Sequence, residues 1–374
     1  MLKISHYELT DIPALGRDWQ ALERKADISF FLSWHWIGTW LDVYQPQVFV
    51  VRAERADGNL CGLGLMSRSR ELRHGVLHTN VLRLHQTGDR AQDQIWIEYN
   101  SFLTETADCQ QTEQQLADYL CQRFPEWDEL VLGAIDEQKA RQLQQHNPLY
   151  LHERWSAPCF GVDLQQLRTE QQSYLSSLTH NTRYQIRRSE RIYQRFGPLH
   201  LRRPETTAQA LQWFDQIAPL HIRRWGSAAH QSGFANPQFV GFHRELIARS
   251  WQHQQVDLVA LYAGETHVAT FYNLMYRNKV YFYLSGIEAV ADNKEKPGLL
   301  GHSYCVQQYL EQGVDFYDFM GGNERYKTQL GKWHSRLVQV ALQRPRLKLK
   351  LERVGRWLKN CLGSTAVTEG NHHD

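Results

Sequence analysis

Apolar and polar residues alternate most regularly between residues 256 and 330. Two segments rich in β-branched and aromatic residues flank a turn at Ala-Gly-Glu, and a third follows a turn at Asn278. Apolar residues then recur at helical spacing from Pro297 to Gly313, and the alternating segment Asp-Phe-Tyr-Asp-Phe-Met follows. A period of two residues is typical of strands, and a period of 3.6 residues is typical of helices. The pattern therefore predicts three strands, a helix and a final strand in one compact α+β unit.

A weaker copy of this layout lies in the first part of the chain. Residues 48–68 repeat the order of residues 256–277: a strand, a turn with an acidic residue and a glycine, and a longer strand. Residues 127–133 match residues 314–321 in pattern and in their place after a helix. The alternative is a coincidence between two ordinary βαβ stretches. The first copy lacks the Pro-Gly helix start and the Gly-Asn-Glu-Arg-Tyr-Lys ending, so we interpret it as a partner domain that shapes the site.

Other segments follow the same two periods. Residues 11–45, 111–123 and 206–225 are expected to be helical. Short apolar runs at residues 81–86 and 94–100 are strand candidates.

A strongly basic helix is predicted between the two copies. Apolar or small residues recur in steps of three and four from Leu178 to Phe196, and Gly197 is a typical helix stop. A solvated helix face and an anion-binding surface are both open interpretations, with Arg183 and Arg187 as candidate anion ligands. Five arginines fall mainly on the other faces of this helix: Arg183, Arg187, Arg188, Arg191 and Arg195.

Length and composition limit the class of protein. A chain of 374 residues exceeds what one core usually accommodates, so two domains are expected. Hydrophobic residues make up 42% of the sequence, yet no run of 18 apolar residues forms a membrane span. The N-terminal segment has an acidic residue where a signal peptide needs an apolar core, so a cytoplasmic location is expected. The formal net charge of +2 gives no reason to expect DNA as a partner.

Neither a metal site nor a disulfide framework is expected. The six cysteines are widely scattered and form no Cys-x-x-Cys motif. Among 18 histidines, only His74 and His78 have helix-like spacing, and they have a glycine between them and no third ligand nearby.

The start of the predicted helix at Pro297 suits an anion. Proline fits the first helical turn because its missing N–H would be unpaired there. Gly298 and Gly301 carry no side chain, so free backbone N–H groups could approach a ligand, and the helix dipole favours an anion such as a pyrophosphate. A Pro-Gly opening also occurs at plain helix starts, so the motif alone is weak.

Together these motifs resemble a known family. The basic helix from Leu178 to Arg188, the strand ending Tyr-Leu-Ser-Gly-Ile-Glu, the Pro-Gly-Leu-Leu helix and Tyr-Asp-Phe-Met-Gly-Gly-Asn-Glu-Arg-Tyr-Lys carry the resemblance. They look like the GNAT-superfamily N-acyltransferases of the BioF2-like and CelD-like (cellulose biosynthesis) type, which are related to the Fem peptidyltransferases. The resemblance is strong over residues 160–340, and over the first 150 residues it is limited to layout.

The resemblance implies an α+β fold built from a tandem pair of GNAT-like domains, with mixed central sheets flanked by helices. Residues 1–155 would form the N-terminal, non-catalytic domain and residues 156–343 the catalytic one. Residues 344–374 would form a basic amphipathic tail with a disordered end.

The resemblance also implies an acyl-CoA donor, usually acetyl-CoA, and an amine acceptor. The helix start would bind the pyrophosphate, and the preceding strand would hold the pantetheine arm. The chain departs from the usual GNAT pyrophosphate loop, Gln/Arg-x-x-Gly-x-Gly/Ala. The expected donor-binding residues are Tyr283, Leu284, Ser285, Pro297, Gly298, Leu299, Leu300 and Gly301.

The expected mechanism is direct attack of a neutral amine on the thioester. Glu324 and Glu288 are the candidate general bases, Tyr326 could return a proton to the thiolate, and Lys327 could orient acidic groups or the substrate. A loop or capping role for Glu324, an exposed cation at Lys327 and a surface carboxylate at Glu288 are the plainer alternatives. Asp318 and Asn323, in the same element, are further substrate-binding candidates.

The C-terminal tail has one apolar helical face, formed by Leu347, Leu351, Val354, Trp357 and Leu358, with basic residues mostly elsewhere. Such a helix either packs on its own domain or lies on the inner face of an anionic membrane.

Three functional hypotheses follow. The first is an N-acyltransferase that uses acyl-CoA and acts on an amine, such as an amino sugar, in envelope or polysaccharide biosynthesis. The second is a Fem-like aminoacyl-tRNA-dependent ligase, in which the arginine helix would bind RNA. The third is a non-catalytic GNAT-fold binding protein in polysaccharide export.

Overall fold

The computed structural model describes residues 2–145, 148–228, 230–290 and 292–365, with side chains as far as Trp357 in the last helix. Within these residues, 13 strands form one continuous sheet. The strand order is β1-β2-β3-β4-β6-β13-β7-β12-β11-β10-β9-β8, with β5 (Leu103–Thr104) pairing with β3 off this path. Two strand pairs, β4 with β6 and β11 with β12, are parallel, and the other pairs are antiparallel, so the sheet is mixed as predicted.

The two halves of the chain repeat one order of elements, which confirms the tandem fold. The first half contains β1 (Lys3–Glu8), α1 (Ile12–Glu23), α2 (Trp34–Tyr44), β2 (Val48–Glu54), β3 (Leu60–Arg73), β4 (Leu77–Leu84), α3 (Cys109–Arg123) and β6 (Glu129–Asp136). The second half contains β8 (Leu199–Arg202), α8 (Thr207–Trp225), α9 (Pro237–Ser250), β9 (Val256–Ala263), β10 (Thr266–Tyr276), β11 (Lys279–Ile287), α10 (Pro297–Glu311) and β12 (Phe316–Gly321).

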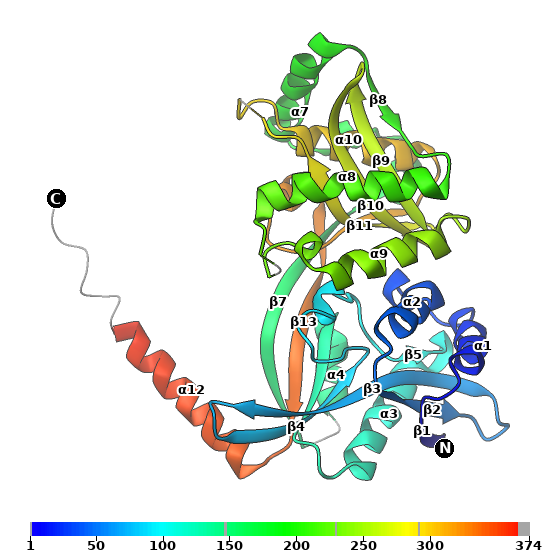
Figure 1. Cartoon of the computed structure of the whole chain (residues 1–374), viewed down its shortest axis with the longest axis vertical. Coiled ribbons are helices and arrows are strands. Elements are labelled where there is room, and N and C mark those ends of the chain that lie inside the picture. Colours follow the sequence, from blue (N-terminus) through cyan, green and yellow to red (C-terminus); the bar gives the residue numbers. More distant parts are fainter. Residues whose placement is uncertain (1, 146–147, 229, 291, 366–374) are drawn as a thin grey trace.

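Each half gives its last strand to the other. The first half continues through α4 (Glu137–Gln145) into β7 (Tyr150–Asp163), and β7 pairs with β12 of the second half. The second half continues through α11 (Arg325–Leu330) into β13 (Lys332–Gln343), and β13 pairs with β6 of the first half. The two exchanged strands also pair with each other, so the sheet runs unbroken between the halves (Figure 1). The expected boundary between residues 155 and 156 falls inside β7.

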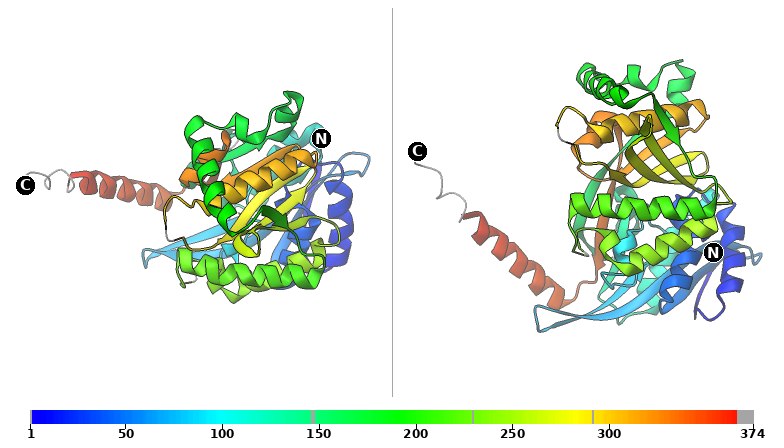
Figure 2. Two further views of the ribbon diagram at one scale, coloured as in Figure 1. Left: turned by 90° about the horizontal axis from the view of Figure 1, so that it is seen from above. Right: turned by 45° about the horizontal axis from the view of Figure 1, so that its top comes forward.

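Helices cover both faces of this sheet. On one face, α1 and α2 pack with α8 and α9 in a core shared by both halves, where Trp36 meets Phe242 edge-on with 4.9 Å between ring centroids. On the other face, α10 packs on the second half together with α5 (Leu164–Thr169), α6 (Tyr174–Ser177) and α7 (His180–Tyr193). Figure 2 shows these layers from two further directions.

The strand expected at residues 94–100 is absent, and that prediction is wrong. The segment forms a 3₁₀ turn (Asp93–Ile95) followed by an irregular stretch in which Trp96 and Tyr99 have left-handed backbone angles, both with φ of 51°. The carboxylate of Asp93 accepts the backbone N–H groups of Thr87 and Gly88 at 2.7 and 2.8 Å, which closes a loop. Apolar alternation alone did not reveal this loop, because its buried side chains belong to the junction between the halves.

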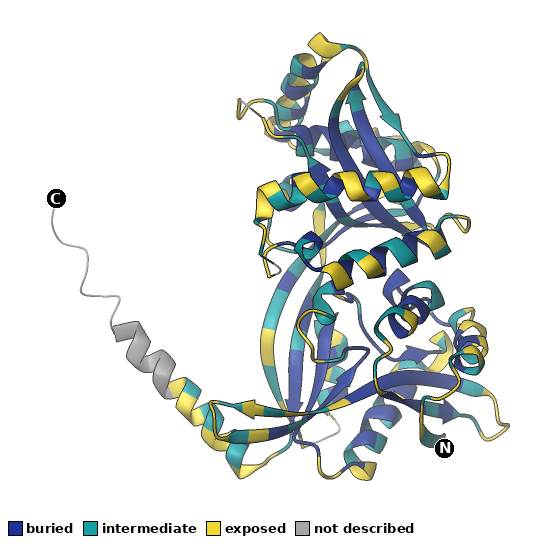
Figure 3. Cartoon of the chain, in the orientation of Figure 1, coloured by how far each residue is buried: buried dark blue, intermediate teal, exposed yellow. Residues whose placement is uncertain are grey.

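The last helix, α12 (Leu347–Thr365), leaves the body of the protein, and Figure 3 shows exposed residues along its described part. No helix in the described part of the chain is long and apolar enough to cross a membrane. The disordered end predicted after Ser364 falls almost entirely outside the described residues.

Candidate active site

Strands β11 and β12 separate after a short parallel contact. They pair only from Lys279 to Tyr281 on β11, opposite Phe316 to Asp318 on β12. Beyond this point β11 continues to Ile287, while β12 bends away at a register shift before Gly321 and pairs with β7. Met320, at the bend, has a left-handed φ of 61°. The backbone of the outer half of β11 is therefore free on the side that faces the opening.

A β-bulge lies at the base of this opening. On β10, Tyr272 pairs with Leu284 and the next residue, Asn273, pairs with Phe282, so Tyr283 is an extra residue on β11. A bulge locally interrupts the ladder and re-aims side chains and backbone groups. The Tyr283 hydroxyl donates to the carbonyl of Ile95 at 2.5 Å, so the end of this side chain is anchored in the core shared by the two halves.

A pocket of about 900 Å³ fills the opening. Its volume is within the range of small-molecule and cofactor sites, roughly 300–1,000 Å³. The walls come from β11 and the loop after it, the end of β12, the start of α10, the start of α11, the end of α8, and two single residues, Glu98 and Gln185. Three of the expected donor-binding residues, Tyr283, Leu284 and Ser285, line it on β11.

The start of α10 forms one wall of this pocket. Lys296 precedes the helix in a left-handed conformation and Pro297 opens it, as the sequence predicts. The pocket lining includes Pro297, Gly298 and Leu299. The first N–H groups of a helix have no partner within the helix, and with proline at the first position those of Gly298 and Leu299 come first. A Cβ at Gly298 would meet only the end of the Ile287 side chain, at 3.1 Å.

Leu300 and Gly301 lie outside the pocket lining, contrary to expectation. Leu300 is fully buried in the core, and its N–H donates to the carbonyl of Lys296 at 3.1 Å. A Cβ on Gly301 would lie 2.4 Å from the ring of Phe271 on β10. This glycine therefore allows close packing of the helix on the sheet and does not contact the pocket.

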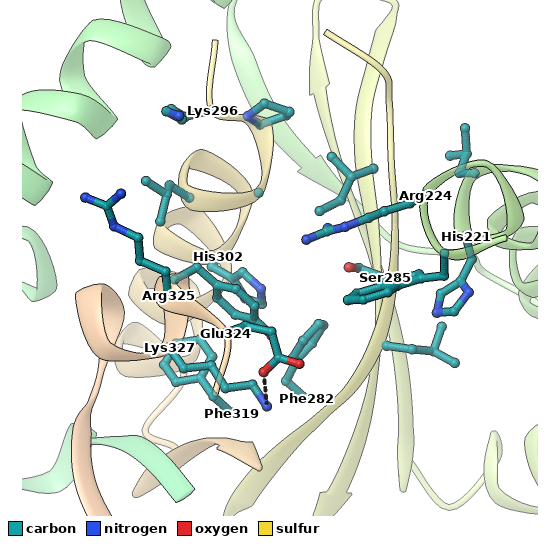
Figure 4. A pocket seen from close by; sticks show the side chains of 18 of the residues that line it. His221, Arg224, Phe282, Ser285, Lys296, His302, Phe319, Glu324, Arg325 and Lys327 are labelled. Carbon is teal, nitrogen blue, oxygen red and sulfur yellow. Dashed lines mark ion pairs between the residues drawn. The ribbon is translucent and has the colours of Figure 1, made fainter. Parts of the chain in front are cut away.

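Cationic side chains surround the mouth of the pocket. Arg223 and Arg224 come from the end of α8, Lys296 from the residue before α10, and Arg325 from α11. Figure 4 shows Arg224 on one wall, with Lys296 and Arg325 on the opposite wall. Two of the acidic lining residues, Glu324 and Glu288, have cationic or histidine partners, so the mouth presents positive charge to an incoming anion.

The Gly-Gly-Asn-Glu-Arg-Tyr-Lys element forms the opposite end of the pocket. Glu324 precedes α11, and one of its oxygens lies 3.3 Å from the ammonium group of Lys327 (Figure 4). The same ammonium donates to the carbonyl of Gly321 at 2.7 Å, so buried Lys327 holds the turn together. Tyr326 stacks on His302 with 5.2 Å between ring centroids, and burial raises its pKa.

Glu288 lies at the outer end of β11 and also lines the pocket. Its carboxylate is 2.9 Å from Nδ1 of His267, and the other nitrogen of that ring contacts the Thr270 hydroxyl at 2.8 Å. The side chain is 39% exposed. Glu288 is therefore a partly solvated, paired carboxylate at the rim.

Glu98 is a pocket residue that the sequence reasoning missed. It comes from the irregular loop of the first half and is 4% exposed. One carboxylate oxygen accepts the backbone N–H of Gly321 at 3.0 Å, and no second hydrogen bond is made with the described residues. Burial raises the pKa of Glu98 to about 8, despite the opposing effects of the Gly321 N–H and of Lys327. No motif marks this position, because it depends on docking of the two halves.

The expected substrate-binding residues lie elsewhere. Asp318 faces the other side of the sheet, where it accepts from the Tyr99 hydroxyl at 2.6 Å and contacts His334 at 3.3 Å. It lines a separate cavity of about 620 Å³ between the halves. Asn323 is exposed and does not line the pocket.

The predicted basic helix is confirmed as α7, but its arginines do not line the pocket. Arg183 donates to the carbonyl of Ser176 at 3.0 Å, and Arg187 is exposed. Gln185 is the residue of this helix that lines the pocket. Four residues of the predicted inner face are buried: Thr182, Ile186, Ser189 and Tyr193. Phe196, which was also placed on this face, is 59% exposed.

The corresponding place in the described part of the first half is filled by side chains. Strands β4 and β6 also separate after three residue pairs, but the following loop fills the space. Nδ1 of His85 contacts the Asn100 side chain at 2.9 Å, and the Asn100 N–H donates to the carbonyl of Ala134 at 3.2 Å. Gln86 occupies the space beside Gly133, where a Cβ would lie 2.3 Å from its side-chain oxygen.

Among the residues that the structure describes, no group of three or more His, Cys, Asp or Glu side chains could hold a metal ion.

Comparison with known proteins agrees with this fold. The crystal structure of FemX aligns with 94% of this chain and 99% of its own, with a TM-score of 0.58 and 9% sequence identity. The structure of L-PGS from Bacillus licheniformis aligns with 92% of this chain and 96% of its own, with a TM-score of 0.54 and 13% identity. The C-terminal DUF2156 domain of a putative lysylphosphatidylglycerol synthetase from Agrobacterium fabrum covers 90% of this chain and 93% of its own, with a TM-score of 0.52 and 9% identity. At such identities the likeness concerns the fold.

No curated protein matches the chain in sequence. A family model described as an acetyltransferase (GNAT) domain matches residues 180–328, which include the opening, α10 and most of α11. The narrower BioF2-like and CelD-like assignment stays a prediction. This match over the second half of the chain supports an acyltransferase with a GNAT-type domain.

Proposed function

We propose that the protein transfers an acyl group from acyl-CoA, with acetyl-CoA the expected donor, to the amino group of an acceptor. An amino sugar in envelope or polysaccharide biosynthesis is the acceptor that the sequence resemblance suggests. The observation that carries the proposal is the pocket between β11 and β12, which joins a free strand edge, a helix N-terminus and a buried carboxyl group.

In the proposed complex, the pyrophosphate end of acyl-CoA lies at the mouth of the pocket and the acyl end lies at its base. The pyrophosphate would lie at the N–H groups of Gly298 and Leu299, where the helix dipole adds to the charges of Arg224 and Lys296. The pantetheine arm would run along the free edge of β11 past Ser285. Backbone groups beyond Tyr281, which β12 does not pair, could hydrogen-bond to the amides of that arm.

The thioester would then reach the base of the opening near the bulge. A neutral amine attacks the carbonyl carbon, a C–N bond forms, and the C–S bond breaks as the tetrahedral oxyanion collapses. Backbone N–H groups of β11 beside Tyr283 are the donors available to the oxyanion. Holding both reactants in one pocket removes much of the entropic barrier.

Glu98 is the best-placed group to take the proton from the amine. It is buried in the pocket, and a pKa of about 8 is close to physiological pH, which suits a general base. We propose Tyr326 as the group that returns a proton to the thiolate, and Lys327 as the residue that positions the turn. Glu324 and Glu288, the bases expected from the sequence, have partners and are more exposed, so we assign them to binding at the rim.

A Fem-like aminoacyl-tRNA-dependent reaction is the second candidate, because the fold is similar to that of FemX and L-PGS. The same opening would then receive the aminoacyl end of the tRNA. The exposed arginines of α7 are the available RNA contacts, although Arg183 is already bound to a carbonyl of α6.

Calorimetry on the full chain tests these candidates. Acetyl-CoA, longer acyl-CoAs, free CoA and aminoacylated tRNA are titrated separately into wild type and into Arg224→Glu. Binding of acyl-CoA that Arg224→Glu weakens about tenfold or more supports the first candidate. Binding of aminoacylated tRNA alone supports the second, and binding of neither contradicts both and favours a non-catalytic protein.

A further inference from the structure

The last helix, α12, presents its apolar face to the outside. The helix projects from the body in all views (Figures 1 and 2). Leu347, Leu351 and Val354 follow helical spacing and are 72%, 63% and 53% exposed, and Trp357 beside them is 63% exposed. A helix of a soluble domain normally turns such a stripe toward the core. The described part of α12 buries Leu349 against the body but leaves this stripe exposed.

Polar side chains of α12 contact the body of the protein through hydrogen bonds, a cation–π contact and an ion pair. The guanidinium of Arg353 donates to the Gln343 side chain at 2.9 Å and lies over the ring of Tyr150, 4.1 Å from its centroid. Arg356 contacts His152 at 2.9 Å, and Glu352 is paired with His74 at 3.4 Å. These contacts fix which face of the helix points outward.

Basic residues predominate in and before α12, and three of them, Lys348, Arg353 and Arg356, contact the body. Residues 344–359 contain seven basic residues and one acidic residue, Glu352. Glu352 faces the body, with 5% of its side chain exposed, whereas Arg346 and Lys350 are exposed beside the apolar stripe. The outward surface therefore combines exposed apolar side chains with cations and no acidic group among the described residues.

The combination of exposed apolar and cationic side chains favours an anionic membrane over a second copy of the chain as the binding partner. Pairing of two copies through this face would bring the exposed cations of both copies, Arg346 and Lys350, close together without an acidic group between them, and like charges at short distance oppose that contact. An anionic bilayer offers negative headgroups to the cations and acyl chains to the apolar stripe. The hairpin of β3 and β4, whose His74 pairs with Glu352, ends beside α12 and adds an exposed apolar residue, Val76, which is 82% exposed.

We propose that α12 docks the protein on the surface of an anionic membrane, lying in the interface with Leu347, Leu351, Val354 and Trp357 toward the lipid. This surface is separate from the pocket at β11 and does not depend on the proposed reaction. An acyltransferase held in this way would meet acceptors at the membrane surface.

Vesicle co-sedimentation of the full chain tests the proposal. The wild type is incubated with vesicles of phosphatidylethanolamine and phosphatidylglycerol, and separately with phosphatidylcholine vesicles. The test variant is Leu351→Gln with Trp357→Gln; both side chains are exposed, so folding is not expected to suffer. The matched control is Phe196→Gln, which removes a similarly exposed apolar side chain far from α12.

We expect the wild type and Phe196→Gln to bind the anionic vesicles, the double variant to bind at least about tenfold more weakly, and none of them to bind phosphatidylcholine strongly. Failure of the wild type to sediment with anionic vesicles, or undiminished binding by the double variant, would overturn the proposal. Sedimentation velocity without lipid provides the competing outcome: a dimer that the double variant abolishes would assign the surface to a second copy of the chain.

Discussion

Burial distinguishes Glu98 from the other two carboxyl groups of the pocket. Glu98 is almost completely enclosed, and loss of hydration raises its pKa to about 8. Glu324 and Glu288 each lie beside a cationic or histidine partner and are 40% and 39% exposed. The three carboxyl groups of the pocket therefore differ in burial and in their partners.

The first prediction concerns Glu98→Gln. The amide keeps an oxygen for the Gly321 N–H but cannot take a proton. In the wild type, kcat/KM should rise as pH increases through about 8, because the fraction of ionised Glu98 rises, and should level off above it. In Glu98→Gln we expect kcat to fall about 100-fold or more and this dependence to disappear, with little change in the Kd for acyl-CoA. Initial rates from pH 6 to 10 measure both effects.

Glu288→Gln is the matched control for this experiment, since it lines the same pocket at the rim. It should keep the pH dependence and lose less than about tenfold in kcat.

A folding control uses the same pKa shift. The pKa of Glu98 is higher in the folded protein than in the unfolded chain. The free energy of unfolding should therefore fall as pH rises from about 4.5 to about 8, by roughly 1.4 kcal/mol for each pKa unit. Unfolding by denaturant should show this loss in the wild type and not in Glu98→Gln. An unchanged kcat in Glu98→Gln would transfer the role of base to another group.

Two glycines of α10 that look alike in sequence have different surroundings. Gly298 borders the pocket, and Gly301 packs against Phe271. We predict that Gly298→Val raises the Kd for acyl-CoA about tenfold with little change in Tm, because the branched side chain blocks approach to the first free N–H groups. Gly301→Ala should lower Tm by several degrees, because its Cβ would lie 2.4 Å from an aromatic ring in a packed core. Calorimetry and thermal unfolding separate the two effects, and a Gly298→Val protein that binds acyl-CoA normally would exclude this helix start as the pyrophosphate site.

The second half was predictable because its pattern is local. The strand periods, the Pro-Gly helix start and the Gly313 stop each depend on residues close in sequence, and the tandem order followed from the repeated layout. Pro297, Gly298 and Leu299, which were predicted from this local motif, line the pocket, and their role in donor binding stays a prediction.

The remaining features depend on contacts between the halves. Glu98 reaches the pocket from a loop 223 residues away from its partner Gly321. Apolar alternation predicted a strand there, but the left-handed residues Trp96 and Tyr99 interrupt it. Asp318 alternates with Phe319 along β12, so it faces the opposite side of the sheet. The position of Glu98 does not follow from local periodicity, because it depends on how the two halves dock. The orientation of Asp318 does follow from the strand period, but the sequence does not show which face of β12 borders the pocket.

Exchange of the last strands makes the two halves one structural unit. Removal of β13 would leave β6 without a partner on one side and would expose the edge of β7 at the same time. Leu132 of β6 lies in a core that includes Val338, Val340 and Leu342 of β13, so a core residue of the first half packs on side chains supplied by the second. The opening at β11 depends on this arrangement, because β12 bends toward β7 instead of following β11.

Leu132→Ala should therefore destabilise both halves together. Loss of a fully buried leucine typically costs about 2–5 kcal/mol. If the sheet unfolds as one unit, the slowest backbone amides of β10, in the second half, should exchange faster by the same factor as those of β3, in the first. Hydrogen exchange with mass spectrometry, on wild type and variant at one pH, measures the two regions in a single experiment. Faster exchange confined to residues 2–145 would mean that the halves unfold independently, and the joined strands would then be a connection between two separate domains.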